Sequence, residues 1–329
     1  MKAVVIREHG SFDSLLLESL PIPEPAADEV RVRIRACALN HLDTWVRRGI
    51  PGVKFPLPLT PGCDGAGVVD RTGEAASDLE EGQEVVLSPG VGHPNDRDYG
   101  ILGETRDGTC AEYIVVPRQN VLPKPSNLSF EEAAAVPLVF LTAWAMLVRR
   151  AQIQPGEWVL VHAAGSGVGS AAVQIAKLFN ARVIATASSE EKRAKALELG
   201  ADEAIPYEKF SRNARRITNK AGVDIVFEHV GPTTWNGSVA ALCKGGRLVT
   251  CGGTSGHEIT FDVRQLFFRS LSFLGNTMGT LDELKTVLRH VEEGRLKAVV
   301  DRVFSLEEIR QAHQRLAERA VFGKVVVVP

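Results

Sequence analysis

The amino-acid sequence predicts an α/β protein with two domains, a β-rich domain followed by a domain built on a doubly wound parallel sheet. Three observations support this fold class. The 329 residues exceed what one hydrophobic core usually supports, so two domains are expected. Short strand-like segments separated by proline and glycine fill the first third of the chain. From Trp158 onward, apolar strand-like segments alternate with helix-like segments.

The first third of the chain is predicted to form strands. Residues 29–39, EVRVRIRACAL, alternate apolar side chains with three arginines, which is the pattern of a half-buried strand whose arginines face solvent. Shorter strands are expected at AVVI, GAGVVDR, EVVLS and AEYIVVP. Together they indicate a small antiparallel, barrel-like domain.

A helix signature marks the end of this domain. Ser129 and Glu132 have the spacing of a capping box, and the segment PKPSNLS ends the strand-rich part of the chain. We therefore expect a first domain of residues 1–125 and a second domain of residues 126–278.

Strands and helices alternate in the second domain. The strand WVLVHA is followed by the helix GVGSAAVQIAKLF, the strand ARVIATA, the helix EEKRAKALEL and the strands DIVFEHV, GRLVTCGG and SLSFLGNTM. Unbroken apolar strands joined by helices are typical of a parallel sheet. Beyond it, we expect residues 279–329 to complete the first domain, with a helix around Leu284, Val287, Leu288 and Val291, a strand VVDRVF, a helix over 306–319 and a closing strand GKVVVVP.

Composition excludes several functional classes. An apolar fraction of 44% and a net charge of −2 provide no bulk charge for nucleic acid or for anionic membranes. Five cysteines without a CxxC pair argue against a disulfide framework and fit a reducing cytosol. No apolar signal core opens the chain, and the apolar run from Val136 to Val148 is too short to span a bilayer. We expect a cytoplasmic protein with a small-molecule substrate.

The turn AAGSGVGS, residues 163–170, carries the clearest chemistry. It lies between a predicted strand and a predicted helix, where the helix N-terminus offers free N–H groups to a dinucleotide pyrophosphate. Small residues fill the G-x-G-x-x-G template at Ala164, Ser166 and Gly169. A flexible glycine-rich loop is the alternative interpretation. We assign to the cofactor Ala164, Gly165, Ser166, Gly167, Val168 and Gly169.

With these motifs in order, the chain resembles the medium-chain dehydrogenase/reductases, and within them the quinone-oxidoreductase-like branch. The resemblance covers MKAVVI, LNHLDTWVRRG, PGCDGAGVV, DGTCAEYIVVP, the glycine-rich turn, KGGRLVTCGG and FGKVVVV. It implies a GroES-like catalytic domain, a Rossmann domain and an active site in the cleft between them. It also assigns Gly252 and Lys324 to cofactor binding.

The resemblance argues against a catalytic zinc ion. The three metal-ligand positions of the zinc alcohol dehydrogenases fall on Asn40, Cys63 and Leu138, of which only Cys63 could bind zinc, although a catalytic site needs three protein ligands. The hydroxyl relay position falls on Leu42, and the structural zinc lobe lacks its four cysteines. We expect no metal; the alternative is a site rebuilt from His41, Cys63, Asp64 or His93.

Three nearby residues therefore need other roles. His41 resembles a basic residue that faces the cofactor pyrophosphate, or is a half-exposed histidine at a helix start. Asp43 resembles the inner aspartate of the family, which orients neighbours such as Cys63; capping of the helix LDTWVRRG is the safer interpretation. Cys37 is expected to be a small core residue.

The function that the resemblance implies is reduction of an activated acceptor. Without a Lewis acid, alcohol oxidation loses its metal-bound alkoxide, whereas a quinone or an enone needs none. We expect NADPH to pass a hydride to such an acceptor, positioned by Asn40 and Thr142. No tyrosine follows the first helix, so enoyl-thioester reduction is disfavoured and water is expected to supply the proton. Candidate apolar walls are Trp45, Ile50, Phe55, Phe140 and Phe268.

Two other functional classes remain open. One is a zinc alcohol or polyol dehydrogenase with substituted ligands. The other is a protein that binds NADPH without catalysis. Metal analysis and a panel of quinones and enones would separate them.

The end of the second Rossmann strand predicts NADPH rather than NADH. Ala187 stands where an NAD enzyme places an acidic residue that repels the 2′-phosphate. Ser188 and Lys192 can bind the phosphate, and Tyr207 matches a second phosphate contact of this branch. Alternatively, Lys192 and Arg193 are solvated side chains of a charged helix, whose Glu190 and Glu191 oppose the phosphate.

A homodimer is the remaining expectation. The segment SLSFLGNTM predicts an apolar edge strand, and relatives pair this edge with the same edge of a second subunit. We expect the contact near Leu274.

Overall fold

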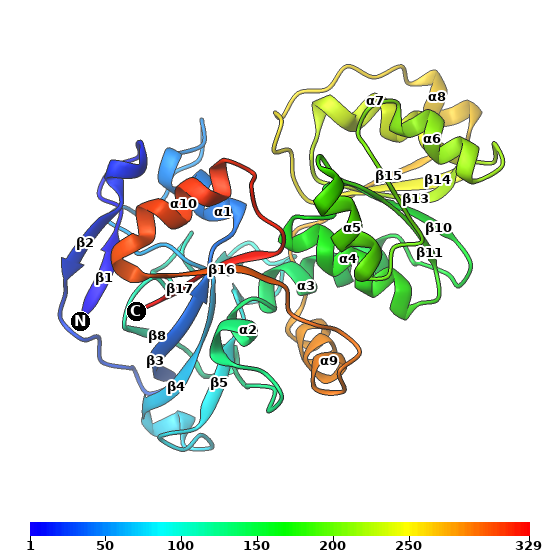
Figure 1. The fold of residues 1–329 in the computed structure, drawn as a ribbon. Coiled ribbons are helices and arrows are strands. Elements are labelled where there is room, and N and C mark those ends of the chain that lie inside the picture. Colours follow the sequence, from blue (N-terminus) through cyan, green and yellow to red (C-terminus); the bar gives the residue numbers. More distant parts are fainter. The chain divides into compact units, whose positions relative to one another are not determined.

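The structure, a computed structural model, describes residues 1–329 and divides into two compact units (Figure 1). One unit comprises Met1–Leu138 with Thr280–Pro329, and the other comprises Val139–Gly279. The division therefore falls after residue 138, whereas the sequence analysis placed it near residue 125. The reason is that helix α2 (Phe130–Ala134), which the Ser129–Glu132 capping box starts as predicted, packs on the sheet of the first unit.

The first unit is built on a seven-stranded sheet in the order β16-β17-β3-β4-β5-β9, with β8 also paired to β3. All pairs are antiparallel except β16 with β17, so the C-terminal segment extends the sheet formed by the N-terminal segment. Its remaining elements, in chain order, are β1 (Lys2–Val5), η1 (Phe12–Ser14), β2 (Leu16–Ser19), β3 (Glu29–Ala38), α1 (His41–Arg48), β4 (Asp64–Thr72), η2 (Glu74–Ala76), β5 (Glu84–Leu87), β6 (Gly90–Val91), β7 (Gly100–Ile101), β8 (Tyr113–Pro117), η3 (Arg118–Asn120), β9 (Val121–Pro123), α9 (Leu281–Glu292), β16 (Val300–Ser305), η5 (Leu306–Glu308), α10 (Ile309–Ala317) and β17 (Lys324–Val328).

Strand β3 lies inside this sheet, where it pairs with β17, β4 and β8. Its alternating sequence suits a strand with one buried face and one exposed face. Val30, Val32 and Ile34 are buried, while the arginines between them are half-buried or exposed, as the sequence predicts. The four apolar residues predicted to anchor a C-terminal helix are all buried on α9. The helix expected over 306–319 begins as the short 3-10 turn η5 and continues as α10.

The second unit contains a six-stranded parallel sheet in the order β12-β11-β10-β13-β14-β15. This topology confirms the predicted doubly wound Rossmann domain, because β11 and β12 are added on one side of β10, the first strand, and β13, β14 and β15 on the other side. Its elements are α3 (Pro137–Trp144, which begins in the first unit), η4 (Ala145–Arg150), β10 (Trp158–Val161), α4 (Gly167–Leu178), β11 (Arg182–Thr186), α5 (Glu190–Glu198), β12 (Glu203–Ile205), α6 (Phe210–Ile217), β13 (Val223–Glu228), α7 (Pro232–Ala241), β14 (Leu242–Thr250), α8 (Arg264–Phe268) and β15 (Ser272–Gly275).

Apolar strand residues such as Leu160, Ile184 and Val226 form the core of this unit together with residues of α6 and α7. None of the helices in the molecule combines the length and the apolar character needed to cross a bilayer.

Candidate functional site

The glycine-rich turn joins the end of β10 to the start of α4. Ser166 caps the helix, because its hydroxyl accepts a hydrogen bond from the Gly169 N–H at 3.0 Å. Ala163 adopts a φ of 44°, in the left-handed region. A β-carbon on Gly169 would lie 2.3 Å from the Ala163 carbonyl oxygen, so only glycine allows this approach of helix and turn.

This geometry fits a dinucleotide pyrophosphate. Ala164 is buried and donates its N–H to the Thr186 carbonyl at 3.0 Å, which ties the turn to β11. Gly165 is buried, whereas Ser166, Gly167 and Val168 are partly exposed at the N-terminus of α4. A capped helix N-terminus with small, partly exposed residues leaves backbone N–H groups accessible to an anion.

The end of β11 carries no acidic side chain. Ala187 is 2% exposed and its N–H bonds to the Ile205 carbonyl at 3.2 Å. Ser188 is exposed, whereas the Ser189 hydroxyl already caps α5 by accepting from the Lys192 N–H at 3.2 Å. Lys192 itself is half-buried on the first turn of that helix.

Arg193 is the residue at this strand end that the sequence analysis treated only as a solvated side chain. One guanidinium nitrogen lies 3.4 Å from the Ala187 carbonyl oxygen, which holds the side chain against the end of β11. The sequence spacing indicates this position: Arg193 follows the helix cap Ser189 by four residues, about one helical turn, so the two residues lie on the same face of α5. Tyr207, the other predicted phosphate contact, stacks on His162 with ring centroids 6.1 Å apart.

In the first unit, Lys324, which the resemblance assigned to cofactor binding, lies in a group of buried polar side chains. Its ammonium group is 2.8 Å from Asp64 Oδ2 and 2.5 Å from Asn40 Oδ1, and its side chain is only 4% exposed. The Asn40 amide nitrogen in turn donates to Asp64 Oδ2 at 2.8 Å and lies 3.2 Å from the Cys63 sulfur. The other Asp64 oxygen accepts from the Leu138 N–H at 2.8 Å. These bonds occupy both ends of the Asn40 amide.

Asp43 caps helix α1 and also anchors the start of β4. Its carboxylate accepts from the Asn40 N–H at 2.6 Å and from the Gly62 N–H at 2.9 Å. Burial raises the pKa of Asp43 to about 6, against the lowering effect of these bonds and of Lys324. Burial and the nearby Asp43 raise the pKa of Cys63 well above that of a free thiol, which disfavours the thiolate form that binds zinc.

The donor set around these positions does not suit a divalent metal ion. No group of three or more His, Cys, Asp or Glu side chains is arranged to hold one. His41 begins α1 and packs edge-on against the Trp45 ring, and His93 is exposed and accepts from the Asn95 N–H at 3.3 Å. The positive charge beside Asp64 is the ammonium of Lys324.

The remaining predicted residues are dispersed over the two units. Thr142 lies on α3, is buried, and its hydroxyl donates to the Met278 sulfur at 3.8 Å. Gly252 follows β14, and its N–H lies 3.5 Å from the Thr250 hydroxyl. Cys37 is buried in β3, 3.8 Å from the Cys110 sulfur, as a core residue would be.

The candidate apolar walls have different surroundings. Trp45 and Ile50 line an open pocket of the first unit, beside Arg48, Gly49 and Pro51. Phe55 packs on the His9 ring, Phe140 is a core residue, and Phe268 is 72% exposed.

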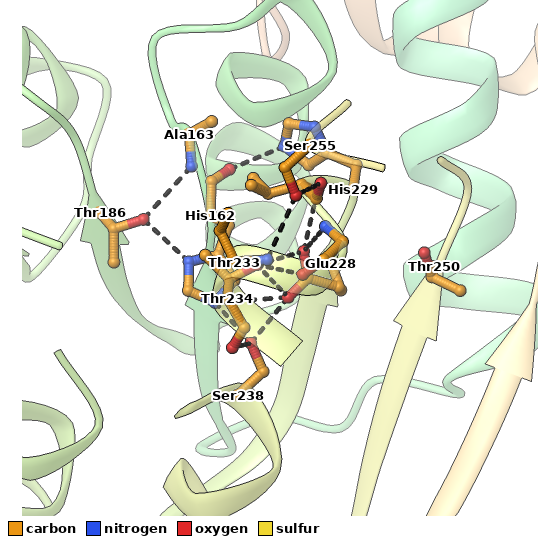
Figure 2. Close-up of polar contacts among 12 residues, drawn as sticks. His162, Ala163, Thr186, Glu228, His229, Thr233, Thr234, Ser238, Thr250 and Ser255 are labelled. Atoms are coloured by element: carbon orange, nitrogen blue, oxygen red, sulfur yellow. Dashed lines mark hydrogen bonds and ion pairs between the residues drawn. The ribbon is translucent and has the colours of Figure 1, made fainter. Parts of the chain in front are cut away.

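Sequence reasoning missed a group of buried polar residues at the carboxyl ends of β10, β11 and β13. His162, Thr186, Glu228 and Ser238 hydrogen-bond to one another beneath the glycine-rich turn (Figure 2). The sequence signals for this group are HAAG and FEHVG, in which His162 and Glu228 are polar residues at the ends of apolar strands.

Comparison with known proteins identifies the family. The model of the alcohol dehydrogenase GroES-like domain matches residues 26–126, and the model of the zinc-binding dehydrogenase family matches residues 167–293. A zinc-type alcohol dehydrogenase-like protein of Schizosaccharomyces pombe is 33% identical, with 99% of each chain covered. The NADPH-dependent alkenal/one oxidoreductase of Arabidopsis thaliana is 35% identical over 100% of this chain and 80% of its own. Human quinone oxidoreductase is 29% identical over 100% of this chain and 98% of its own.

Solved structures agree with these relatives. An NAD-dependent alcohol dehydrogenase superposes with a TM-score of 0.96 at 49% identity, with both chains fully covered. A cobalt- and zinc-bound alcohol dehydrogenase from Pyrobaculum aerophilum superposes with a TM-score of 0.89 at 32% identity, covering 100% of this chain and 99% of its own. The chain therefore belongs to the medium-chain dehydrogenase/reductase superfamily, in its quinone-oxidoreductase-like branch, and is an oxidoreductase.

Proposed function

We propose that this protein uses NADPH to reduce a quinone or another conjugated carbonyl compound without a catalytic metal. The observation that carries the proposal is the buried ammonium of Lys324, which bonds to Asn40 and Asp64 where zinc enzymes of the family gather metal ligands. The Lys324 ammonium would repel a divalent cation bound beside Asn40 and Asp64, and burial would strengthen this repulsion. Without a Lewis acid, reduction of an activated acceptor is the favoured chemistry.

When bound, NADPH supplies the hydride. The protein's own share is to bind the pyrophosphate at the N-terminus of α4 and to orient the acceptor. Thr142 remains a proposed positioning residue for the acceptor. The amide of Asn40, the other predicted residue, is 5% exposed and is occupied by Asp64 and Lys324, so its proposed part is to hold the Lys324 ammonium. Water remains the proposed proton source.

Preference for NADPH is a separate part of the proposal. Ala187 places no carboxylate at the end of β11, and Arg193 presents a guanidinium there, which donates a hydrogen bond of 3.4 Å to the Ala187 carbonyl. Guanidinium groups bind phosphate through paired, charge-assisted hydrogen bonds. We therefore add Arg193 to Ser188, Lys192 and Tyr207 as a candidate ligand of the 2′-phosphate.

Titration of NADPH and NADH tests this preference. Arg193→Ala and Lys192→Ala should each weaken NADPH binding by about tenfold, the value of one charge-assisted bond, and leave NADH unchanged. Ala187→Asp should reverse the preference by repelling the phosphate. Lys195→Ala is the matched control, because its ammonium pairs with Glu191 at 2.7 Å on the same helix. Equal affinities for both cofactors in the unchanged protein would contradict the proposal.

An alcohol dehydrogenase is the second candidate function, favoured by the 49% identical structure of that name. Metal analysis of protein purified without chelators, together with activity assays, distinguishes the two. We expect NADPH oxidation by quinones or enones and far less than one zinc ion per chain. Stoichiometric zinc whose removal abolishes activity would overturn the proposal, and tight NADPH binding without any turnover would favour a non-catalytic role.

We also propose a homodimer that pairs β15 with its copy. This strand ends the parallel sheet and is paired only to β14, which leaves one edge of backbone groups unpaired within the sheet. Leu274 on this strand is half-buried. Pairing of two such edges would remove an exposed edge.

A further inference from the structure

A buried network of hydrogen bonds lies at the carboxyl ends of three strands of the second unit (Figure 2). The carboxyl-end network consists of His162 after β10, Thr186 at the end of β11, Glu228 at the end of β13, and Thr234 and Ser238 on α7. Each of these residues is at most 3% exposed. The reduction chemistry proposed above uses none of their side chains.

Glu228 is the fixed end of the network. Its Oε1 accepts from the N–H groups of Val230 at 2.7 Å and Gly231 at 3.1 Å, and its Oε2 accepts from the Ser238 hydroxyl at 2.7 Å. Burial raises the pKa of Glu228, but the hydrogen bonds that its carboxylate accepts outweigh burial and hold the pKa below its usual value. An ionised carboxylate only accepts hydrogen bonds, so Ser238 must donate its proton here.

The proton positions of His162 follow from this requirement. Because the Ser238 proton points to Glu228, the Ser238 oxygen accepts from His162 Nε2, 2.9 Å away. Burial lowers the pKa of His162 to about 4, so the ring is neutral at neutral pH and carries one proton, on Nε2. The bare Nδ1 accepts from the Thr186 hydroxyl at 3.0 Å, and Thr186 Oγ1 accepts from the Ala163 N–H at 3.3 Å. In each of the four hydrogen bonds that link Ala163 to Glu228, the donor is therefore the group nearer to Ala163 and the acceptor is the group nearer to Glu228.

Ala163 is the residue that this chain of bonds holds. Its φ of 44° is disfavoured for a residue with a β-carbon. Its carbonyl accepts from the Ser166 N–H at 2.8 Å and lies against Gly169, so its conformation sets the course of the pyrophosphate turn. The carbonyl of His162 accepts from His229 Nε2 at 2.8 Å, which fixes the preceding peptide as well.

The network also supports the predicted phosphate side of the cofactor site. The Tyr207 ring stacks on the His162 ring with an interplanar angle of 13°. A change in the His162 ring orientation would therefore reach both the pyrophosphate turn and Tyr207.

We propose that His162, Thr186, Ser238 and Glu228 are positioning residues for the dinucleotide, because their one-way chain of hydrogen bonds holds Ala163 in the left-handed conformation of the pyrophosphate turn. This inference rests on the proposed binding of NADPH. None of the four side chains needs to touch the cofactor; they act through the backbone of the turn.

The direction of the chain can be measured in the cofactor-free protein. Nitrogen NMR of histidine-labelled protein, with the His162 signals assigned by their loss in His162→Gln, should show a neutral ring protonated on Nε2. Glu228→Gln presents an amide N–H to Ser238 and releases the Ser238 proton to His162, 2.9 Å away, or to the Thr234 carbonyl, 3.0 Å away, so the fraction of rings protonated on Nε2 should fall. A wild-type ring protonated on Nδ1, or a charged ring at neutral pH, would overturn the inference.

Cofactor affinity tests the consequence. Ser238→Ala should weaken NADPH binding by about tenfold, the value of one buried hydrogen bond, as measured by fluorescence titration. Thr218→Val is the matched control: this hydroxyl is also buried in the second unit, and it donates to the Ala214 carbonyl at 2.9 Å and accepts from the Gly222 N–H at 3.0 Å. The control should lose comparable stability in urea and keep its NADPH affinity.

The outcomes separate this inference from the proposed function. Unchanged affinity in Ser238→Ala, or an equal loss in Thr218→Val, would refute a positioning role. Should Ser238→Ala fail to fold, Thr186→Val breaks the same chain beside Ala163 and carries the same expectation. Wild-type protein that binds neither NADPH nor NADH would instead refute the proposed function, while the NMR result on the free protein would still decide the direction of the chain.

Discussion

Replacing Lys324 by methionine tests the charge arrangement on which the metal-free proposal depends. The ammonium and Asp64 Oδ2 are 2.8 Å apart, and the two side chains are 4% and 0% exposed, so water screens neither charge. Removal of one partner from such a pair costs about 3–5 kcal/mol, because the other charge stays buried without a counter-ion. Asp64 keeps its bonds from Asn40 and Leu138, so we expect a loss near the lower end, about 3 kcal/mol.

A double-mutant cycle with Asp64→Asn isolates the interaction. The double variant Lys324→Met/Asp64→Asn contains no unpaired charge, so it should lose less stability than the two single losses added together. Urea titration followed by circular dichroism measures each free energy of unfolding. Lys195→Met is the control, since its pair with Glu191 is exposed and should contribute less than about 1 kcal/mol. A loss in Lys324→Met no larger than in this control, or strict additivity in the cycle, would refute the reasoning.

Three further predictions concern the turn, the sheet edge and acid stability. Gly169→Ala should abolish detectable NADPH binding in a fluorescence titration, because the new β-carbon would lie 2.3 Å from a backbone oxygen; wild-type affinity would contradict this. Leu274→Lys should shift light scattering from dimer to monomer, and a wild-type monomer at micromolar concentration would count against the dimer. His313 is fully buried with no partner on either ring nitrogen, and burial, with a contribution from Arg47, lowers its pKa to about 3. Below about pH 6.5 the unfolded chain therefore binds more protons at this residue than the folded chain, so the free energy of unfolding falls as the pH falls. His313 should lower the free energy of unfolding by about 2 kcal/mol between pH 7.5 and 5. In urea titrations, His313→Leu should remove that part of the pH dependence.

Local pattern was enough to predict much of the fold. The alternation of Val30, Val32 and Ile34 with arginines identified β3, and apolar spacing identified α9, because such periods depend only on which face of an element is buried. The glycine-rich turn was equally readable, since its small residues and its place between strand and helix are neighbours in the sequence. The position of the unit boundary was not readable, because it depends on which sheet α2 packs against.

Only the tertiary structure decided which polar side chains meet. Lys324 is 284 residues from Asn40 and 260 residues from Asp64, and nothing in their local sequence indicates that β17 pairs with β3 and brings them together. His162, Thr186 and Ser238 are likewise joined across three separate elements of the second unit. Sequence spacing constrains contacts within one helix or strand, whereas contacts between elements depend on sheet order and packing, which many sequences satisfy with different residues. The sequence alone therefore determined the family and the glycine-rich turn between strand and helix, while the buried ammonium and the carboxyl-end network depend on the folded chain.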